Sequence, residues 1–269
     1  MVANIFHPGR TYLYLKMYFF ENGRRLGLLY LAIFAFVVLW MGVYLNFTNP
    51  MLFSERAQVA YYFVTLFLSG CLSAGVLFSE LGSRDKSIHY FLVPASIPEK
   101  FLTSVFFAVV VFFVGCSAVF WLVDFTMVSI ANNKFESNWQ VLNPMSLNKY
   151  PNPFFDGPVT QIFYLYFPIQ AIFILCSIYF KRYALFKAIV IMGLLWVVSI
   201  AVFLIYRQLV PVGMLHFSAG TYEVLETSGD NKMIELPHWI TMVSSVFFKY
   251  LLTPLLLTVA YFRLKEKEL

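Results

Sequence analysis

The side chains that most often carry out chemistry are sparse in this sequence and do not cluster. Its four histidines lie far apart and form no H-E-x-x-H pair, so their spacing does not indicate a metal site. The sequence has no G-x-x-x-x-G-K-[ST] pattern, the usual loop that holds the phosphates of ATP. We therefore expect no catalytic residues, no bound metal and no cofactor in this chain, and we do not expect an enzyme.

Lys249 is the single most unusual residue, because it lies near the middle of a long apolar run. A cation at that depth of a membrane is costly unless it faces protein or water. Gln170, at comparable depth in another run, could accept a hydrogen bond from it, whereas Asp124 lies close to the outer end of its own run. Two interpretations stay open. Lys249 and Gln170 line a substrate path or a subunit seam, or Lys249 has no functional role because it is buried against backbone carbonyls or the span is shifted in register.

The composition is that of a membrane protein. Hydrophobic residues make up 60% of the chain and charged residues 12%, compared with about a quarter charged in ordinary globular domains. The apolar runs are continuous and repeatedly reach the ~20 residues that cross a bilayer as a helix. The sequence therefore predicts an all-α, polytopic membrane protein with a single domain over residues 1–269. Cys71, Cys116 and Cys176 fall inside these runs, as small apolar fillers.

Six membrane spans are expected, preceded by a lead-in segment at residues 4–25. The lead-in is aromatic but interrupted by charges, which favours an amphipathic helix in the plane of the membrane interface. Two long outer loops, 129–158 and 207–238, separate later spans; in the second, Leu209–Phe217 is apolar enough to dip back toward the membrane, and Ser218–Glu235 is polar and solvated. The expected spans are 26–47, 57–79, 101–128, 159–180, 184–206 and 239–262.

The basic residues indicate the orientation of the chain. Most of the 19 lysines and arginines lie at span ends on one side, as the positive-inside rule expects, so they do not indicate nucleic-acid binding. We expect the cell (inner) membrane, with both termini and segment 80–100 in the cytoplasm. The residues on that side are Arg10, Lys16, Arg24, Arg25, Arg84, Lys86, Lys100, Lys181, Arg182, Lys187, Arg263, Lys265 and Lys267.

Segment 80–100 is the one sizeable polar stretch between spans on the expected cytoplasmic side. Within it, Ser87–Val93 has the pattern of a short amphipathic helix with Ile88, Phe91 and Leu92 on one face. Pro94 ends that helix, because proline lacks a backbone donor and disfavours helix in the residue before it. A short helix held between two spans is well placed to contact another protein.

The second expected span contains a group of small residues. Small residues three or four positions apart let membrane helices approach closely. They are Ser69, Gly70, Ser73, Ala74 and Gly75.

The stretch Leu92-Val93-Pro94-Ala95-Ser96-Ile97-Pro98-Glu99-Lys100-Phe101 resembles the type-2 class of ABC exporter permeases. Many bacterial members join their second and third spans by a similar Leu-x-Pro-x-Ser-x-x-Glu-Lys stretch. The resemblance implies a permease subunit that works with a second permease subunit, identical or related, and with a separate ATP-binding subunit that carries ATP and Mg. The resemblance also implies that the lead-in segment corresponds to the connecting helix of that family. It also implies a coupling helix that contacts the ATPase through Arg84, Asp85, Lys86, Ser87, Ile88, His89 and Phe91.

Other classes of membrane protein stay open from the residues alone. A secondary transporter or channel places paired ionisable groups at mid-depth, whereas Lys249 stands nearly alone. A non-transporting membrane scaffold is the other alternative. Dependence on an ATPase partner separates the exporter from both, and the sequence does not identify a substrate.

Overall fold

The chain is a multi-pass helical membrane protein, with six helices long and apolar enough to cross a bilayer among the described residues. The computed structural model describes residues 7–47, 54–78, 88, 90, 92–135, 138–142, 159, 161–180, 183–209, 214–218, 221–225, 231–235, 239, 242–243 and 246–267. The helical elements are α1 (Pro8–Phe47), α2 (Glu55–Val76), α4 (Ile97–Phe106), the π-helical η3 (Phe107–Val111), α5 (Phe112–Phe135), α6 (Gln161–Tyr179), α7 (Ala184–Leu209), the π-helical η5 (Phe247–Leu251) and α9 (Leu252–Glu266).

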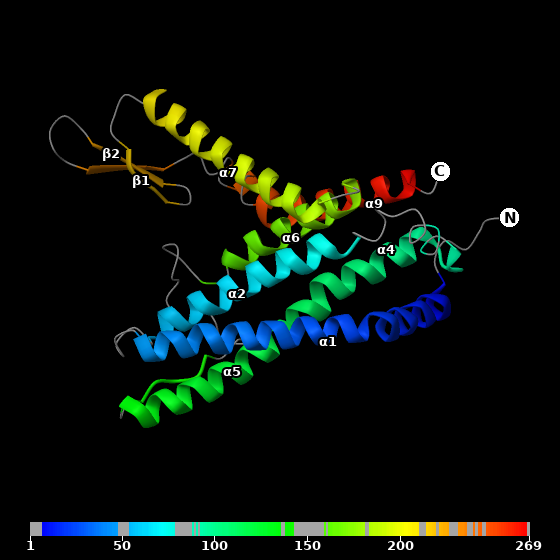
Figure 1. Cartoon of the computed structure of the whole chain (residues 1–269). Helices are drawn as coiled ribbons and strands as arrows, with labels where there is room; N and C mark the ends of the chain where they lie inside the picture. Colours follow the sequence, from blue (N-terminus) through cyan, green and yellow to red (C-terminus); the bar gives the residue numbers. More distant parts are fainter. Residues whose placement is uncertain are drawn as a thin grey trace.

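The helices run along one another, and the two chain ends lie at the same end of the molecule (Figure 1). Helices α2 and α6 are central: half or more of the residues in their apolar windows are buried. Helix α6 contacts α2, α7 and α9, while α1 packs along α5. The start of α4 lies at the same end as the chain termini (Figure 1).

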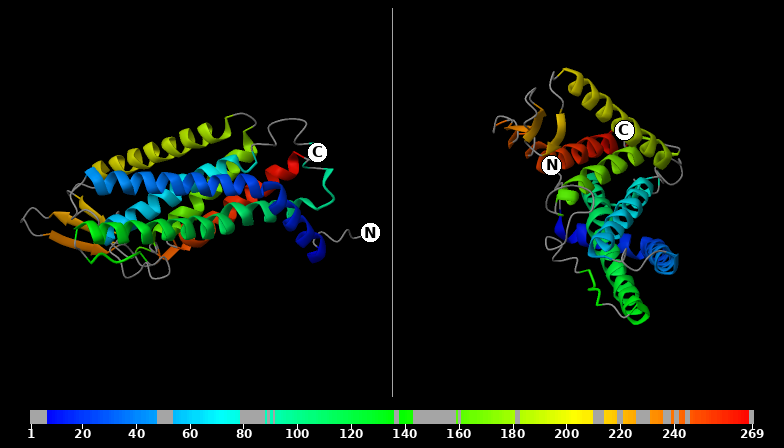
Figure 2. Two further views of the ribbon diagram at one scale, coloured as in Figure 1. Left: turned by 60° about the horizontal axis from the view of Figure 1, so that its bottom comes forward. Right: turned by 90° about the vertical axis from the view of Figure 1, so that its left-hand side faces the viewer.

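The lead-in and the first span form one continuous helix, α1, of 40 residues. The helix does not break at the expected boundary near residue 25, because it carries only Gly23 and Gly27 there and glycine weakens a helix far less than proline. The placement of the lead-in at the membrane interface stays a prediction. At 1.5 Å per residue α1 is about 60 Å long, twice the ~30 Å of a bilayer core, so part of it lies outside the hydrocarbon core. Its first turns bend away from the remainder (Figure 2, left).

The third span is also longer than predicted, because α4, η3 and α5 continue from Ile97 to Phe135 without a break. The π-helical turn η3 lies within it. The Tyr30 hydroxyl of α1 donates a hydrogen bond to the carbonyl of Val111, at the end of this turn, with 3.0 Å between the oxygens. A Cβ atom at Gly115 would overlap the Tyr30 ring. Glycine at this position thus lets α1 lie directly against α5.

The small residues of α2 contact other helices, as predicted. A Cβ atom at Gly70 would overlap the Gln170 amide and the Tyr166 hydroxyl of α6, and one at Gly75 would lie 3.3 Å from Leu185 of α7. The absence of side chains at these positions brings α2 close to two neighbours.

Three short strands lie between α7 and η5: β1 (Met214–Ser218), β2 (Thr221–Leu225) and β3 (Asn231–Glu235). They pair antiparallel in the order β1-β2-β3, with Tyr222 opposite Ile234. The outer loop expected at 207–238 therefore contains a small sheet, and the remaining elements of the described chain are helical, as expected. The sheet lies at the end of the molecule away from the chain termini (Figure 1).

Candidate functional site

The sequence around Ser96 fixes where α4 begins. Ser96 is the N-cap residue with extended backbone, and Pro98 stands in the first turn, where proline's missing N–H costs nothing. Glu99 folds back so that its Oε2 accepts a hydrogen bond from the Ser96 N–H at 2.9 Å. This is the carboxylate half of a capping box, and it turns the Glu99 side chain toward the start of the helix.

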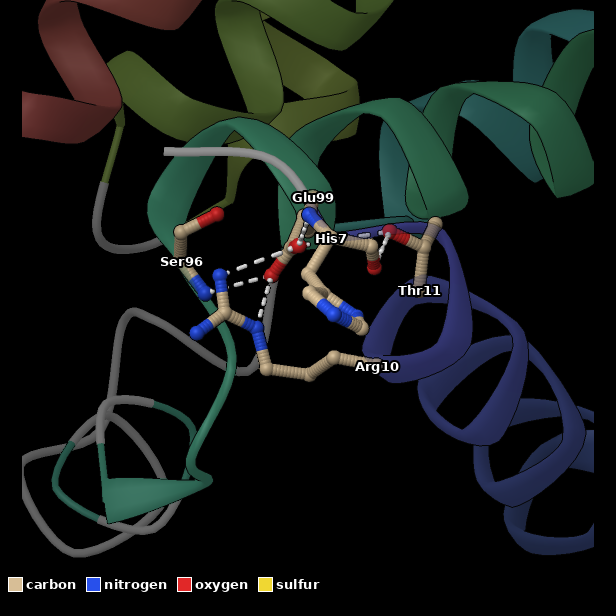
Figure 3. A network of polar contacts seen from close by, with 5 residues as sticks. All are labelled: His7, Arg10, Thr11, Ser96 and Glu99. Atoms are coloured by element: carbon tan, nitrogen blue, oxygen red, sulfur yellow. Dashed lines mark hydrogen bonds and ion pairs between the residues drawn. The ribbon is translucent and has the colours of Figure 1, made fainter. Parts of the chain in front are cut away.

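Glu99 also binds the first turn of α1 (Figure 3). Its side chain is fully buried. Arg10 donates from Nε to Oε2 at 2.8 Å and from Nη2 to Oε1 at 3.0 Å, the two-pronged geometry that makes an arginine–carboxylate pair strong. The His7 N–H donates to Oε1 at 2.9 Å, and the Thr11 hydroxyl does so at 3.3 Å. The start of α1 is thereby joined to the start of α4.

Lys100, the next residue, joins α4 to the short helical segment that precedes it. Its side chain is buried, and its Nζ donates to the carbonyl of Tyr90 at 2.9 Å while lying 5.4 Å from the centre of the Tyr90 ring. The Tyr90 ring contacts Phe78 at the end of α2, and Phe78 in turn stacks on Phe101. Segment 88–92 is therefore held between the end of α2 and the start of α4.

We call these residues the Glu99–Lys100 cluster: His7, Arg10, Thr11, Tyr90, Ser96, Glu99 and Lys100. Both oxygens of the Glu99 carboxylate accept hydrogen bonds within the chain. The carboxylate therefore has a structural role. The arrangement suits a mechanical connection between α1 and α4 better than it suits catalysis. Lys100 thus connects Tyr90 to α4, and Glu99 connects α4 to the start of α1.

Most predicted coupling residues, namely Arg84, Asp85, Lys86, Ser87, His89 and Phe91, lie outside the described residues. Ile88, Tyr90 and Leu92 are helical, and the helical segment ends before Pro94, as predicted. Ile88 is 50% exposed and Leu92 75% exposed. Being four residues apart, they share one helical face, so the segment presents apolar side chains that the chain itself does not cover.

Lys249 lies in η5 and is exposed rather than buried against carbonyls. Its Nζ lies 5.2 Å from the centre of the Tyr164 ring of α6. The Tyr164 ring also contacts Tyr250. No acidic side chain in the described part of the chain pairs with Lys249. In that part, its positive charge interacts with the face of the Tyr164 ring instead.

Gln170 and Asp124 are both buried in helix interfaces. Gln170 donates from Nε2 to the Tyr166 hydroxyl at 2.7 Å and fills the space above Gly70. It stands six residues, about 9 Å, along α6 from Tyr164, so its role as a pathway residue stays a prediction. Asp124 accepts a hydrogen bond from the Leu142 N–H at 2.8 Å, which attaches residues 138–142 to α5.

Comparison with family models, with curated proteins and with solved structures found no match for this chain.

Proposed function

We propose that the chain is the permease subunit of an ATP-driven ABC exporter. It sits in the cell (inner) membrane with both termini in the cytoplasm, and it acts with a second permease subunit, identical or related. A separate ATP-binding subunit carries ATP and Mg and supplies the energy.

One observation carries this proposal. Three residues of the stretch that resembles the exporter permeases, Ser96, Glu99 and Lys100, are the residues through which α4 is bonded to α1 and to segment 88–92. An exporter permease needs a joint at this place, since a force applied by the ATPase between the second and third spans has to reach the helices that line the path.

The exposed side chains of segment 88–92 support a protein partner there. Ile88 and Leu92 leave apolar surface at the end of the molecule, and the adjoining sequence carries Arg84 and Lys86. Apolar side chains beside positive charges suit contact with a protein surface that has an apolar hollow and an acidic rim.

Photocrosslinking in living cells tests the proposal. A benzophenone amino acid replaces Ile88, and in a matched control it replaces Ile130, an isoleucine of similar exposure near the far end of α5. We expect the probe at position 88 to capture an ATP-binding protein, and the probe at 130 to capture none. A position-88 probe that captures only lipid, or no nucleotide-binding protein, would contradict the proposal.

A further inference from the structure

An apolar groove of about 130 Å³ lies between the α4–η3 junction, α6 and α9. Its walls include Val105, Val109 and Val110 on the third span, Phe167 and Ala171 on α6, and Thr253 on α9. Val110 and Phe167 are 47% and 37% exposed. A dry, apolar space of this size accepts hydrocarbon and does not hold water.

Two helix faces that line the groove, one on α6 and one on η5 and α9, extend along their helices to the positively charged Lys249. On α6, Tyr164, Phe167 and Ala171 recur at spacings of three and four residues and so share one face. On η5 and α9, Lys249 lies four residues before Thr253 and belongs to the corresponding face. The two faces meet at Lys249, whose Nζ lies over the Tyr164 ring. Lys249 and Tyr164 therefore lie about one helical turn beyond the residues that line the groove.

Lys249 lies at the membrane depth expected for the headgroup of a lipid whose acyl chain occupies the groove. Lys249 stands 14 residues, about 21 Å, along the helix from Arg263 near the chain end, and the bilayer core is about 30 Å thick. Lys249 therefore lies nearer the membrane face remote from the chain termini. From Lys249 the groove runs toward the bilayer centre, the direction that an acyl chain takes.

We propose that this groove binds an anionic phospholipid of that leaflet, with its phosphate at Lys249 and one acyl chain between η3, α6 and α9. Among the described residues no carboxylate pairs with Lys249, so its charge favours an anionic head, and the apolar walls accept part of one acyl chain. The site does not depend on the exporter function, because both its parts belong to this chain.

The test measures lipid retained by the full-length protein, purified with whatever subunits accompany it. Native mass spectrometry follows the release of the protein from nanodiscs that contain equal dioleoyl phosphatidylglycerol and dioleoyl phosphatidylcholine. We expect phosphatidylglycerol to be retained preferentially, and Lys249→Met to weaken that retention roughly fivefold, the effect of about one lysine near an anionic headgroup. Lys265→Met, an exposed lysine at the end of the same helix, is the control and should leave retention unchanged.

A second pair of variants tests whether a lipid acyl chain occupies the groove. Val110→Trp places a large ring in the groove and should abolish retention of both lipids. Val114→Trp, one turn along at an exposed position that does not line the groove, should not. Unchanged phosphatidylglycerol preference in Lys249→Met, or wild-type retention in Val110→Trp, overturns the proposal. So does a Lys249→Met variant whose only change is weaker association between copies of the chain, since Lys249 would then face protein.

Discussion

At the scale of single residues, Glu99 joins α1 to α4 at the end of the molecule where the chain termini lie. A fully buried carboxylate is costly unless hydrogen bonds replace the lost water. Here the replacements come from two regions far apart in sequence: Ser96 in its own helix, and His7 and Arg10 at the start of α1. Because the donors belong to different elements, satisfying the carboxylate also aligns those elements.

Replacing Glu99 should destabilise the protein much more than replacing an exposed glutamate. Glu99→Gln keeps the shape but removes the charge that attracts Arg10, which should lower the free energy of unfolding by about 2 kcal/mol. Glu266→Gln is the control: it removes a carboxylate, 60% exposed, from the Arg263–Glu266 pair, and exposed pairs contribute little. Chemical unfolding in detergent compares the two, and equal losses would contradict the role given to Glu99.

Among single residues, the sequence indicated that Lys249 is unusual but not which residues bind Glu99. Lys249 could be found because a cation stands out in an apolar run. The partners of Glu99 could not, since Arg10 lies 89 residues earlier and neither stretch carries a local pattern that marks the pair. The motif around Ser96 and Glu99 predicted that this place matters, but only the packing of α1 against α4 reveals what Glu99 binds.

At the scale of elements, run length predicted the spans well, because crossing a bilayer requires about 20 apolar residues. The π-helical turns η3 and η5 could not be predicted: a span that is apolar on every side has no periodicity to reveal a widened turn. The sheet had a detectable signal in the strand-like residues on either side of Gly220 and of Gly229-Asp230. The long apolar spans on either side dominate the sequence pattern of this region and obscure that signal.

The contact between α2 and α6 depends on the missing side chain at Gly70. Gly70→Val should destabilise the protein by roughly 1–3 kcal/mol, the usual cost of overpacking, because the added atoms overlap Gln170 and Tyr166. Gly193→Val introduces the same residue in α7, where nothing lies within 4 Å of the added Cβ atom. Thermal unfolding in one detergent compares them. A loss as large in Gly193→Val would mean that helix propensity, and not close packing, dominates.

Segment 88–92 should tolerate substitution without loss of membrane insertion. The double variant Ile88→Asp with Leu92→Asp places charges on side chains that are already exposed, so the chain should fold, while at least tenfold less ATP-binding subunit should co-purify with it. Ile130→Asp, at the other end of the molecule, is the matched control. The docking assignment fails if the double variant recovers as much partner as wild type.

At the scale of the whole molecule, the helices differ in how far the chain covers them. Helix α7 is almost entirely exposed in the single chain, whereas α2 and α6 are largely buried. The single chain therefore leaves α7 for lipid or for a second permease subunit, while α2 and α6 form its core.

The distribution of positive charges predicts the orientation of the molecule, and this prediction can be tested directly. Ser83→Cys and Ser228→Cys place thiols in the segment between α2 and α4 and in the loop between β2 and β3. We expect a membrane-impermeant maleimide to label position 228 from outside intact cells, and position 83 only after the membrane is opened. Labelling of both positions from one side, or of position 83 from outside, would contradict the proposed topology.

The central claim, that a separate ATPase drives this chain, is tested most directly by purification from the native membrane. The full-length protein is extracted in a mild detergent, and mass spectrometry identifies what accompanies it. We expect an ATP-binding protein in stoichiometric amount, lost when residues 84–93 are altered. A chain that remains alone across several mild detergents would contradict the exporter account and favour a secondary transporter or a scaffold.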